Sequence, residues 1–208
     1  MYETPHFRED DLDIQHGLIE AFPLGLLISA APGGIIANPI PFILYRAEGA
    51  RGTLRCHLAK ANPQWQALAE NPAALLVFQG SQSYVTASWY ATKAETEKVV
   101  PTWNYAIVQA RGPARIVTDT AWLHANVAAL TDQQEGRRQQ PWAVTDAPEP
   151  FIAAQLKGIV GVEIPIETIS GKFKASQNRP AADRVGVAEG LAEANPEMAK
   201  MVRERGGV

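Results

Sequence analysis

Cysteine is nearly absent from this sequence: Cys56 is the only one among 208 residues. One thiol cannot form an internal disulfide, and it cannot supply a paired-cysteine metal or redox site. Because Cys56 stands in the apolar-leaning run 53–58, we predict that it is a small core residue. The start of the chain also lacks the basic and apolar regions of a secretion signal. We therefore expect a cytoplasmic protein.

The sequence has no excess of charge of one sign. Lysine and arginine number 19 against 22 acidic residues, a formal net charge of -3. This balance argues against a protein built mainly to coat nucleic acid. Basic residues gather only within 172–184, where a solvated loop is the favoured interpretation and a DNA-contacting arm the alternative. The residues concerned are Lys172, Lys174, Arg179 and Arg184.

The usual signatures of catalysis are missing. No phosphate-binding GxxxxGK[ST] loop, GxGxxG turn, GxSxG elbow or HExxH motif occurs. The four histidines do not stand at metal-ligand spacing, so we predict no metal site. Acidic residues are scattered, without a pair placed for acid–base chemistry. No helix-turn-helix stands out, and the catalytic residues, if any, stay unknown.

A long uninterrupted apolar segment is missing too. Residues 21–45 carry no charge, but prolines and glycines recur through them. These residues break helices, so a membrane-spanning helix is excluded. Two buried strands around the turn 31–34 explain the same residues better. We expect no membrane association.

The patterns that are present favour a mainly β fold with some helices. Apolar residues make up 46% of the chain, enough for a sizeable core. The last segment, 181–205, is only weakly helical and predicts a mobile or partner-packed tail. We predict one domain over 1–208 with 181–208 as a C-terminal tail. Strands are expected at 24–30, 35–45, 53–58, 74–79, 84–87, 103–117 and 158–169, and helices at 59–71, from 118 or 119 through 130, and at 148–156.

The first segment of chemical interest is 57–65, where a strand should meet a helix. A helix start offers free backbone N–H groups and a positive dipole end, and Lys60 adds a cation. Together these features suit a phosphate dianion. An ordinary helix start with a solvated Lys60 explains the same residues and is slightly favoured.

Two further segments mix aromatic and polar side chains. Segment 83–93 brings hydroxyls, two aromatic rings and Lys93 within reach of one another, as a flat anionic ligand requires. In 99–108, Trp103 and Tyr105 should share one strand face and Thr102 and Asn104 the other. The competing interpretation of 83–93 is a core aromatic pair with a surface lysine. The competing interpretation of 99–108 is a core strand whose polar groups are hydrogen-bonded within the protein.

The sequence resembles the PaiB-type family of FMN-binding negative transcriptional regulators along nearly its whole length. The resemblance implies an α+β, mainly β split barrel of the FMN-binding and pyridoxamine-phosphate-oxidase-like type, with peripheral helices. It also implies a homodimer with flavin mononucleotide (FMN) near the subunit interface. The blocks that carry it include PLGLLIS at 23–29, HLAKANPQW at 57–65, YVTASWYATK at 84–93, VPTWNYAIVQARG at 100–112, GKFKASQNR at 171–179 and GVAEGL at 186–191.

The resemblance also suggests which residues bind the cofactor. Lys60 and Asn62 are the candidates for the flavin phosphate. The sequence departs from the family pattern at three of its motifs: Lys60 stands for the usual arginine, Gln109 for a histidine and Ala87 for a proline. The full predicted set is His57, Lys60, Asn62, Ser88, Trp89, Tyr90, Lys93, Thr102, Trp103 and Asn104.

Three functions follow as hypotheses. The first is a flavin-binding regulator with a DNA or regulatory-protein partner. The second is an FMN-dependent oxidoreductase, in which the flavin carries the redox chemistry. The third is a dimeric interaction protein that has lost the flavin. The regulatory function comes from analogy with the family, because a fold does not determine a function.

Overall fold

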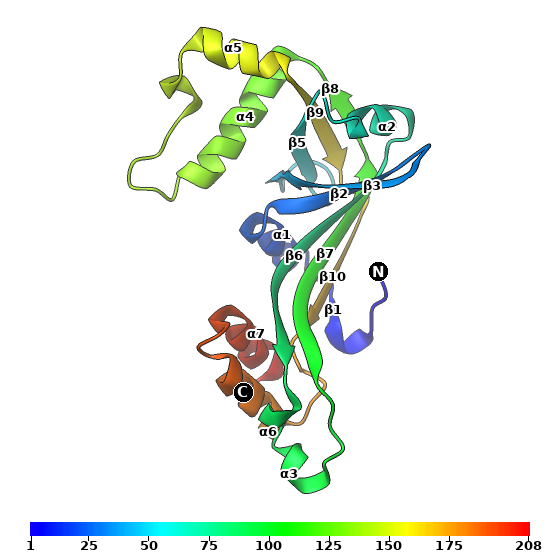
Figure 1. Cartoon of the computed structure of the whole chain (residues 1–208), viewed down its shortest axis with the longest axis vertical. Helices are drawn as coiled ribbons and strands as arrows, with labels where there is room; N and C mark the ends of the chain where they lie inside the picture. Colours follow the sequence, from blue (N-terminus) through cyan, green and yellow to red (C-terminus); the bar gives the residue numbers. More distant parts are fainter. The chain divides into compact units, whose positions relative to one another are not determined.

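The structure is a computed structural model that describes residues 1–208 (Figure 1). It divides into two compact units, each of which is described by itself. The long strands β6 (Ala73–Val85) and β7 (Thr102–Pro113) contribute residues to both. Unit 1 comprises Met1–Leu18, Gln79–Val108 and Ser170–Val208, and unit 2 comprises Ile19–Phe78 and Gln109–Ile169.

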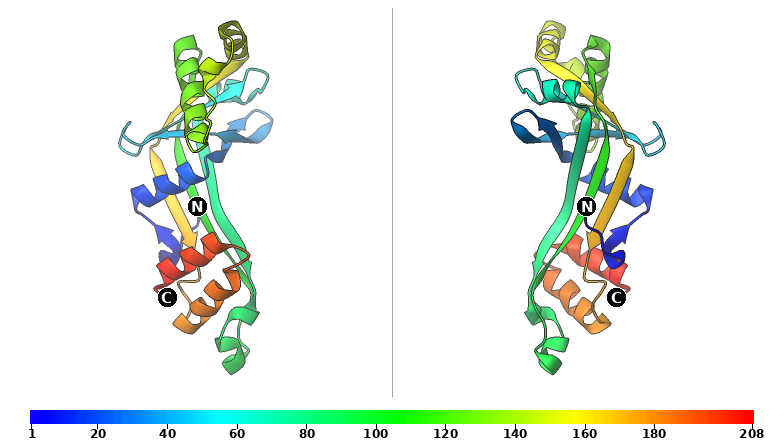
Figure 2. Two further views of the ribbon diagram at one scale, coloured as in Figure 1. Left: turned by 90° about the vertical axis from the view of Figure 1, so that its left-hand side faces the viewer. Right: turned by 90° about the vertical axis from the view of Figure 1, so that its right-hand side faces the viewer.

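Unit 1 is built on antiparallel strands in the order β1, β10, β7, β6. Its helices α6 and α7 lie side by side in both views of Figure 2 and pack on each other. Most of α1 also belongs to this unit. The bounds are β1 (Arg8–Glu9), β10 (Thr168–Lys174), η1 (Pro5–Phe7), α1 (Leu12–Ala21), η2 (Ala87–Trp89), α3 (Thr92–Thr96), α6 (Ala181–Leu191) and α7 (Pro196–Gly206).

Unit 2 contains a hairpin beside β6 and a second sheet. The hairpin strands β2 (Leu24–Ala31) and β3 (Gly34–Pro41) pair in full register around the predicted turn. The second sheet has the order β4, β5, β9, β8, and α4 packs on β5 and β9. The remaining bounds are β4 (Ile43–Tyr45), β5 (Thr53–Ala59), β8 (Arg115–Val117), β9 (Ile159–Pro165), α2 (Gln64–Glu70), α4 (Thr120–Glu135), η3 (Val144–Asp146) and α5 (Glu149–Lys157).

The uncharged segment 21–45 forms strands on both sides of the predicted turn, but only β2 contains buried residues, so the prediction that both strands are buried is wrong for β3. β3 carries its prolines at an outer edge of its sheet, where a missing N–H costs no ladder hydrogen bond. The predicted strand 35–45 is interrupted at Phe42, a buried side chain between β3 and β4. None of the helices combines the length and the apolar character that crossing a membrane requires.

Several predicted element boundaries need correction. The predicted strand 103–117 breaks at Ala114, whose N–H donates to the Pro72 carbonyl at 2.7 Å. Likewise 158–169 is divided between β9 and β10, and 74–79 and 84–87 are parts of the single strand β6. Helix α2 begins only at Gln64, because β5 continues through Ala59 and a turn follows.

Other predictions of local structure are confirmed. Cys56 is fully buried in β5. The apolar face of β9, represented by Val160 and Val162, is buried throughout. Asp119 caps α4 by accepting a hydrogen bond from the Trp122 N–H at 2.7 Å. Local patterns determine these features, because each involves near neighbours or a regular period.

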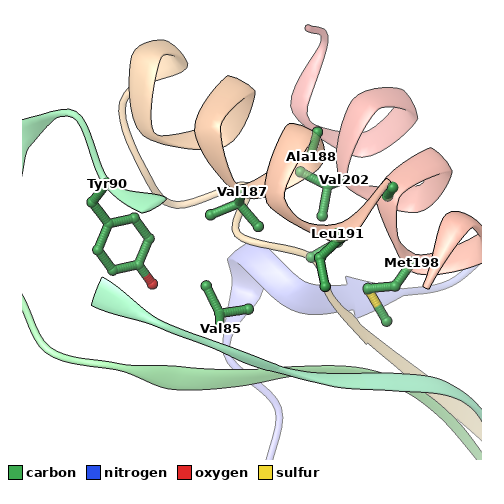
Figure 3. Close-up of a cluster of buried hydrophobic side chains, with 9 residues drawn as sticks. Val85, Tyr90, Val187, Ala188, Leu191, Met198 and Val202 are labelled. Atoms are coloured by element: carbon green, nitrogen blue, oxygen red, sulfur yellow. The ribbon is translucent and has the colours of Figure 1, made fainter. Parts of the chain in front are cut away.

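Residues 181–208 form α6 and α7, which help to build the core of unit 1. Figure 3 shows Val187, Leu191 and Met198 turned toward Val85 of β6. All four side chains are fully buried. The end of the chain is therefore packed into the core of unit 1. That the chain forms a single domain, with 181–208 as a C-terminal tail, stays a prediction.

Candidate functional site

The predicted cofactor residues fall into two groups, one in each unit. His57, Lys60 and Asn62 belong to unit 2. The other seven predicted residues, in 88–104, belong to unit 1. Each group is described within its own unit, and convergence of the two groups into one site stays a prediction.

In unit 2, Lys60 and Asn62 already have partners within the protein. The Lys60 ammonium donates to the carbonyl of Lys157, the last residue of α5, at 2.7 Å. A cation at a helix C-terminus interacts favourably with the dipole and the free carbonyls there. The Asn62 side chain accepts a hydrogen bond from the Gln64 N–H at 3.0 Å, as a turn residue before a helix does. These contacts give both residues a structural role in addition to the predicted one.

Lys60→Ala tests whether this residue also holds the flavin phosphate. We expect FMN affinity to fall by at least ~1 kcal/mol, about fivefold, the scale of a lost charged hydrogen bond. Fluorescence titration of the apo-protein measures the affinity. Lys60→Arg, which restores the usual family residue and keeps the charge, is the control and should bind FMN at least as tightly. Unchanged affinity in a folded Lys60→Ala protein would remove Lys60 from the site.

His57 lies on β5 and is largely withdrawn from water. Its Nδ1 atom is 3.5 Å from the side-chain nitrogen of Asn126, a buried residue of α4. Burial lowers the pKa of His57 below its ordinary value of 6.5, so the neutral imidazole is favoured. His57 also lines a hollow of about 490 Å³ with Trp142, Leu130 and other residues of unit 2. The hollow thus offers a neutral imidazole among mostly apolar neighbours.

The lowered pKa of His57 predicts a loss of stability in mild acid. The unfolded chain binds a proton at this histidine more readily than the folded chain does. Stability is therefore full above the unfolded pKa of 6.5 and falls as the pH drops below it. Urea unfolding across this pH range measures the free energy of unfolding of the wild type and of His57→Gln. The stability advantage of the wild type over the variant should shrink toward acid pH. Parallel pH profiles for the two proteins would contradict it.

In unit 1, the loop after β6 gathers Ser88, Tyr90 and Lys93. The Lys93 ammonium donates to the Ser88 hydroxyl at 3.3 Å, and all three residues line a hollow of about 580 Å³. Trp89 is half-buried and packs against the core cluster of unit 1. The segment therefore presents a cation and a hydroxyl beside a hollow, while Trp89 anchors the loop.

Trp103 is exposed on β7, with 53% of its surface accessible. Its ring meets that of Tyr84 edge to face, with 6.0 Å between the centroids. The opposite face of the strand carries Asn104, which is fully buried and bonded to the Ser176 hydroxyl at 2.9 Å. Asn104 thus behaves as a satisfied core residue, whereas the Trp103–Tyr84 pair offers an exposed aromatic surface.

A small pocket of about 110 Å³ lies where β7, β10 and the Tyr90 loop meet. We call it the Tyr90 pocket. Tyr90 is 3% exposed, and its hydroxyl makes no hydrogen bond of ordinary geometry within the protein, although the charge of the nearby Arg179 acts on it. The guanidinium of Arg179 lies 4.4 Å from the centre of the Tyr90 ring. The pocket is lined by Tyr90, Val100, Pro101, Thr102, Asn104, Lys174, Ser176, Asn178 and Arg179.

Lys174 supplies a second cation to this pocket. Its ammonium donates to the Thr102 hydroxyl and, at 2.6 Å, to the Trp103 carbonyl. Burial lowers the pKa of Lys174, and the positive charges of Lys172 and Arg179 lower it further. No carboxylate lines the pocket. Its two cations therefore face hydroxyl, amide and carbonyl groups but no countercharge.

The sequence did not predict the role of Lys174, Ser176 and Arg179. The favoured interpretation of 172–184 as a solvated loop needs correction, because Lys172 and Lys174 lie on β10 and Lys172 is only 9% exposed. Alternation along a strand could have suggested that 172 and 174 share one face. Only the folded chain shows that this face meets Thr102 and Tyr90.

The residues of unit 1 fit FMN in kind. FMN combines a flat aromatic ring system, hydroxyls and a phosphate dianion. Unit 1 offers an exposed Trp103–Tyr84 pair, a buried phenol and, in the Tyr90 pocket, two cations with no carboxylate in the lining. Aromatic surface and unpaired cations are the complement that such a ligand requires.

Comparison with known proteins relates the whole chain to one family. Residues 1–168 match the family model described as "Putative FMN-binding domain". An uncharacterized protein of Emericella nidulans is 36% identical, with 99% of this chain and 98% of that protein covered. The protease synthase and sporulation protein PAI 2 of Bacillus subtilis is 28% identical, with 99% and 98% covered.

A solved structure supports the fold. The FAD and heme binding protein of Mycobacterium smegmatis superposes with a TM-score of 0.57 at 17% identity, over 80% of this chain and 73% of that one. At this identity the likeness concerns the fold alone. The predicted split-barrel fold class is confirmed. The chain belongs to the FMN-binding domain family that its first 168 residues match, and FMN is its cofactor.

Proposed function

We propose that this protein is an FMN-binding negative transcriptional regulator that acts through a protein partner. The proposal is carried by the resemblance of the chain's motifs to a family of negative transcriptional regulators, together with the end-to-end match with the protease synthase and sporulation protein PAI 2 of Bacillus subtilis. Because FMN is the cofactor, the flavin-free hypothesis is not pursued.

The basic segment supports a protein partner over direct DNA binding. The Lys172 ammonium donates to the Tyr2 carbonyl at 3.1 Å, and Lys174 donates to Thr102 and to the Trp103 carbonyl. DNA affinity depends on cations that are free to neutralise phosphates. Both lysines lie on strand β10, Lys172 buried and Lys174 half-buried, so residues 172–174 present no extended basic arm to the DNA backbone.

Transcript profiling tests the regulatory role. A strain that lacks the protein should show derepressed transcripts, which return to the original level when the wild-type chain is expressed again. A promoter fragment from a derepressed gene should not be retarded by the purified protein alone, but should be retarded when cell extract supplies the partner. Unchanged transcripts in the deletion strain would contradict the regulatory role. Salt-sensitive retardation by the pure protein would contradict the partner.

An FMN-dependent oxidoreductase is the second candidate. The observation that favours it is the likeness to the flavocytochrome Anf3 of Azotobacter vinelandii, with a TM-score of 0.58 at 16% identity. Bound flavin supplies its own electron-transfer chemistry, so the protein needs only to hold and orient it. Rapid oxidation of NADH or NADPH by the FMN-loaded protein, with transfer to an added acceptor, would favour this function.

We also propose that the protein forms a homodimer. In unit 2, one face of the sheet leaves Leu24 and Leu26 of β2 exposed, and Val77 of β6 stands opposite Leu26 in register. Directly paired residues of neighbouring antiparallel strands share one face. Large exposed apolar side chains gathered on a sheet face are typical of an interface. A second copy would cover the same face by two-fold symmetry.

Leu26→Asp is expected to weaken the dimer at least about tenfold, because a desolvated carboxylate would stand in an apolar interface. The side chain is 42% exposed in the single chain, so the fold should tolerate the change. Analytical ultracentrifugation over a concentration series measures the dissociation constant. Glu70→Gln, at an exposed position of helix α2, is the control. A wild-type chain that sediments as a monomer at all concentrations would contradict the dimer.

A further inference from the structure

We propose that the Tyr90 pocket is a binding site for a single oxyanion group, a phosphoryl or a carboxylate, held by Lys174, Arg179 and the Tyr90 hydroxyl. The proposal concerns a site in unit 1 alone. It does not depend on the regulatory role, and the experiment below keeps the two apart.

The size of the pocket selects a small group. At about 110 Å³ it has room for the equivalent of three or four water molecules, at ~30 Å³ each. Pockets for whole drug-sized ligands span roughly 300–1,000 Å³. An isoalloxazine ring is too large for this pocket, whereas one tetrahedral phosphate or planar carboxylate is of the right size.

The charges around the pocket select an anion. Lys174 and Arg179 line it and no carboxylate does, and the charge of the nearby Asp183 also acts on Tyr90. Asp183 is fully buried, and its two oxygens accept hydrogen bonds from the Thr92 N–H and hydroxyl at 2.9 Å each. Asp183 therefore directs its hydrogen bonds to Thr92, and it is not part of the pocket lining. A bound anion would relieve the mutual repulsion of the two cations.

The Tyr90 hydroxyl is buried, and the fold provides no acceptor for its hydrogen bond. Buried hydroxyls almost always have a hydrogen-bond partner, and one without costs about 1–3 kcal/mol. Tyr90 is held in place by Arg179 on its ring and by the core cluster of unit 1. An oxygen of a bound anion would accept the missing hydrogen bond. Within the single chain, only the nearby Arg179 guanidinium acts favourably on this hydroxyl.

Two sources of the oxyanion share this chemistry. One is the phosphate of FMN. In that case the rest of the FMN molecule would extend from the Tyr90 pocket into the neighbouring hollow, which is lined by Ser88 and the exposed Lys93. The other is an independent small ligand that carries a phosphate or carboxylate. Riboflavin, which is FMN without the phosphate, separates the two sources.

The test measures binding of inorganic phosphate, FMN and riboflavin to the full chain, by isothermal titration and by the fluorescence of its tryptophans. We expect millimolar phosphate to bind the flavin-free protein. Arg179→Gln should weaken that binding at least about tenfold, the effect of one lost charged hydrogen bond. Tyr90→Phe removes only the hydroxyl and should weaken it severalfold. Lys200→Gln, a lysine exposed on α7 of the same unit, is the matched control and should bind like the wild type.

The flavin measurements identify the source. If Arg179→Gln weakens FMN binding but not riboflavin binding, the pocket holds the flavin phosphate. If it weakens phosphate binding and leaves both flavins unaffected, the pocket serves another ligand. Both outcomes support an oxyanion site. Folded Arg179→Gln and Tyr90→Phe proteins that bind phosphate and FMN as the wild type does, or a wild type that binds neither, would overturn it. Failure of the wild type to bind either flavin, with phosphate binding intact, would instead contradict the FMN assignment.

Discussion

Replacement of Gly186 by alanine is expected to destabilise the protein by about 2 kcal/mol, although it places a better helix former in α6. A Cβ at this position would stand 2.1 Å from the carbonyl oxygen of Trp89, a backbone atom that cannot turn aside. Overpacking of this kind costs up to about 3 kcal/mol. The higher helix propensity of alanine offsets about 1 kcal/mol of this overpacking cost. Chemical unfolding of the two proteins measures the difference.

Gly17→Ala is the matched control for that prediction. Gly17 also lies within a helix, α1, and a Cβ there would meet nothing within 4 Å. We expect this variant to gain up to about 1 kcal/mol of stability. A Gly186→Ala protein as stable as Gly17→Ala would show that α6 does not lie against the Trp89 backbone. Gly190 belongs to the same contact, since its Cβ would stand 2.3 Å from the Trp89 ring.

Asp183→Ala should cost about 3 kcal/mol and loosen the loop that carries Ser88 and Lys93. The fully buried Asp183 carboxylate accepts from both the N–H and the hydroxyl of Thr92, at the first residue of α3. Hydrogen bonds to a charged group contribute about 1.5–3 kcal/mol, and alanine leaves both donors unsatisfied. Urea unfolding measures the loss of stability. Hydrogen exchange of the Asp183→Ala variant should show that residues 87–97 open faster than the strands do.

Asp183→Asn distinguishes hydrogen bonding from simple packing at this position. The amide keeps the shape and one acceptor oxygen, so about half of the stability loss should remain. Equal stability of the alanine and asparagine variants would mean that the hydrogen bonds to Thr92 contribute little. Protection of 87–97 unchanged in Asp183→Ala would show that α6 does not hold the loop.

Local patterns predicted much of the architecture. The hairpin around 31–34, the strand with buried Val160 and Val162, and the cap at Asp119 all follow from turn chemistry, period and near neighbours. Boundaries were less accurate, because tertiary hydrogen bonds such as Ala114 to Pro72 decide where a strand ends. The weak periodicity of 181–205 concealed helices α6 and α7, and the two glycines of α6, Gly186 and Gly190, make room for Trp89.

By itself the sequence identified the family, because its motifs resemble those of that family, and this resemblance implied the mainly β split-barrel fold and FMN as the cofactor. It also singled out Tyr90 and Thr102. Only the tertiary structure decided that Lys174 and Arg179 join them, while Lys60 holds the end of α5 and Asn104 is satisfied in the core. The physical reason is that burial, a missing countercharge and an unpartnered hydroxyl are properties of residues distant in sequence that folding brings together.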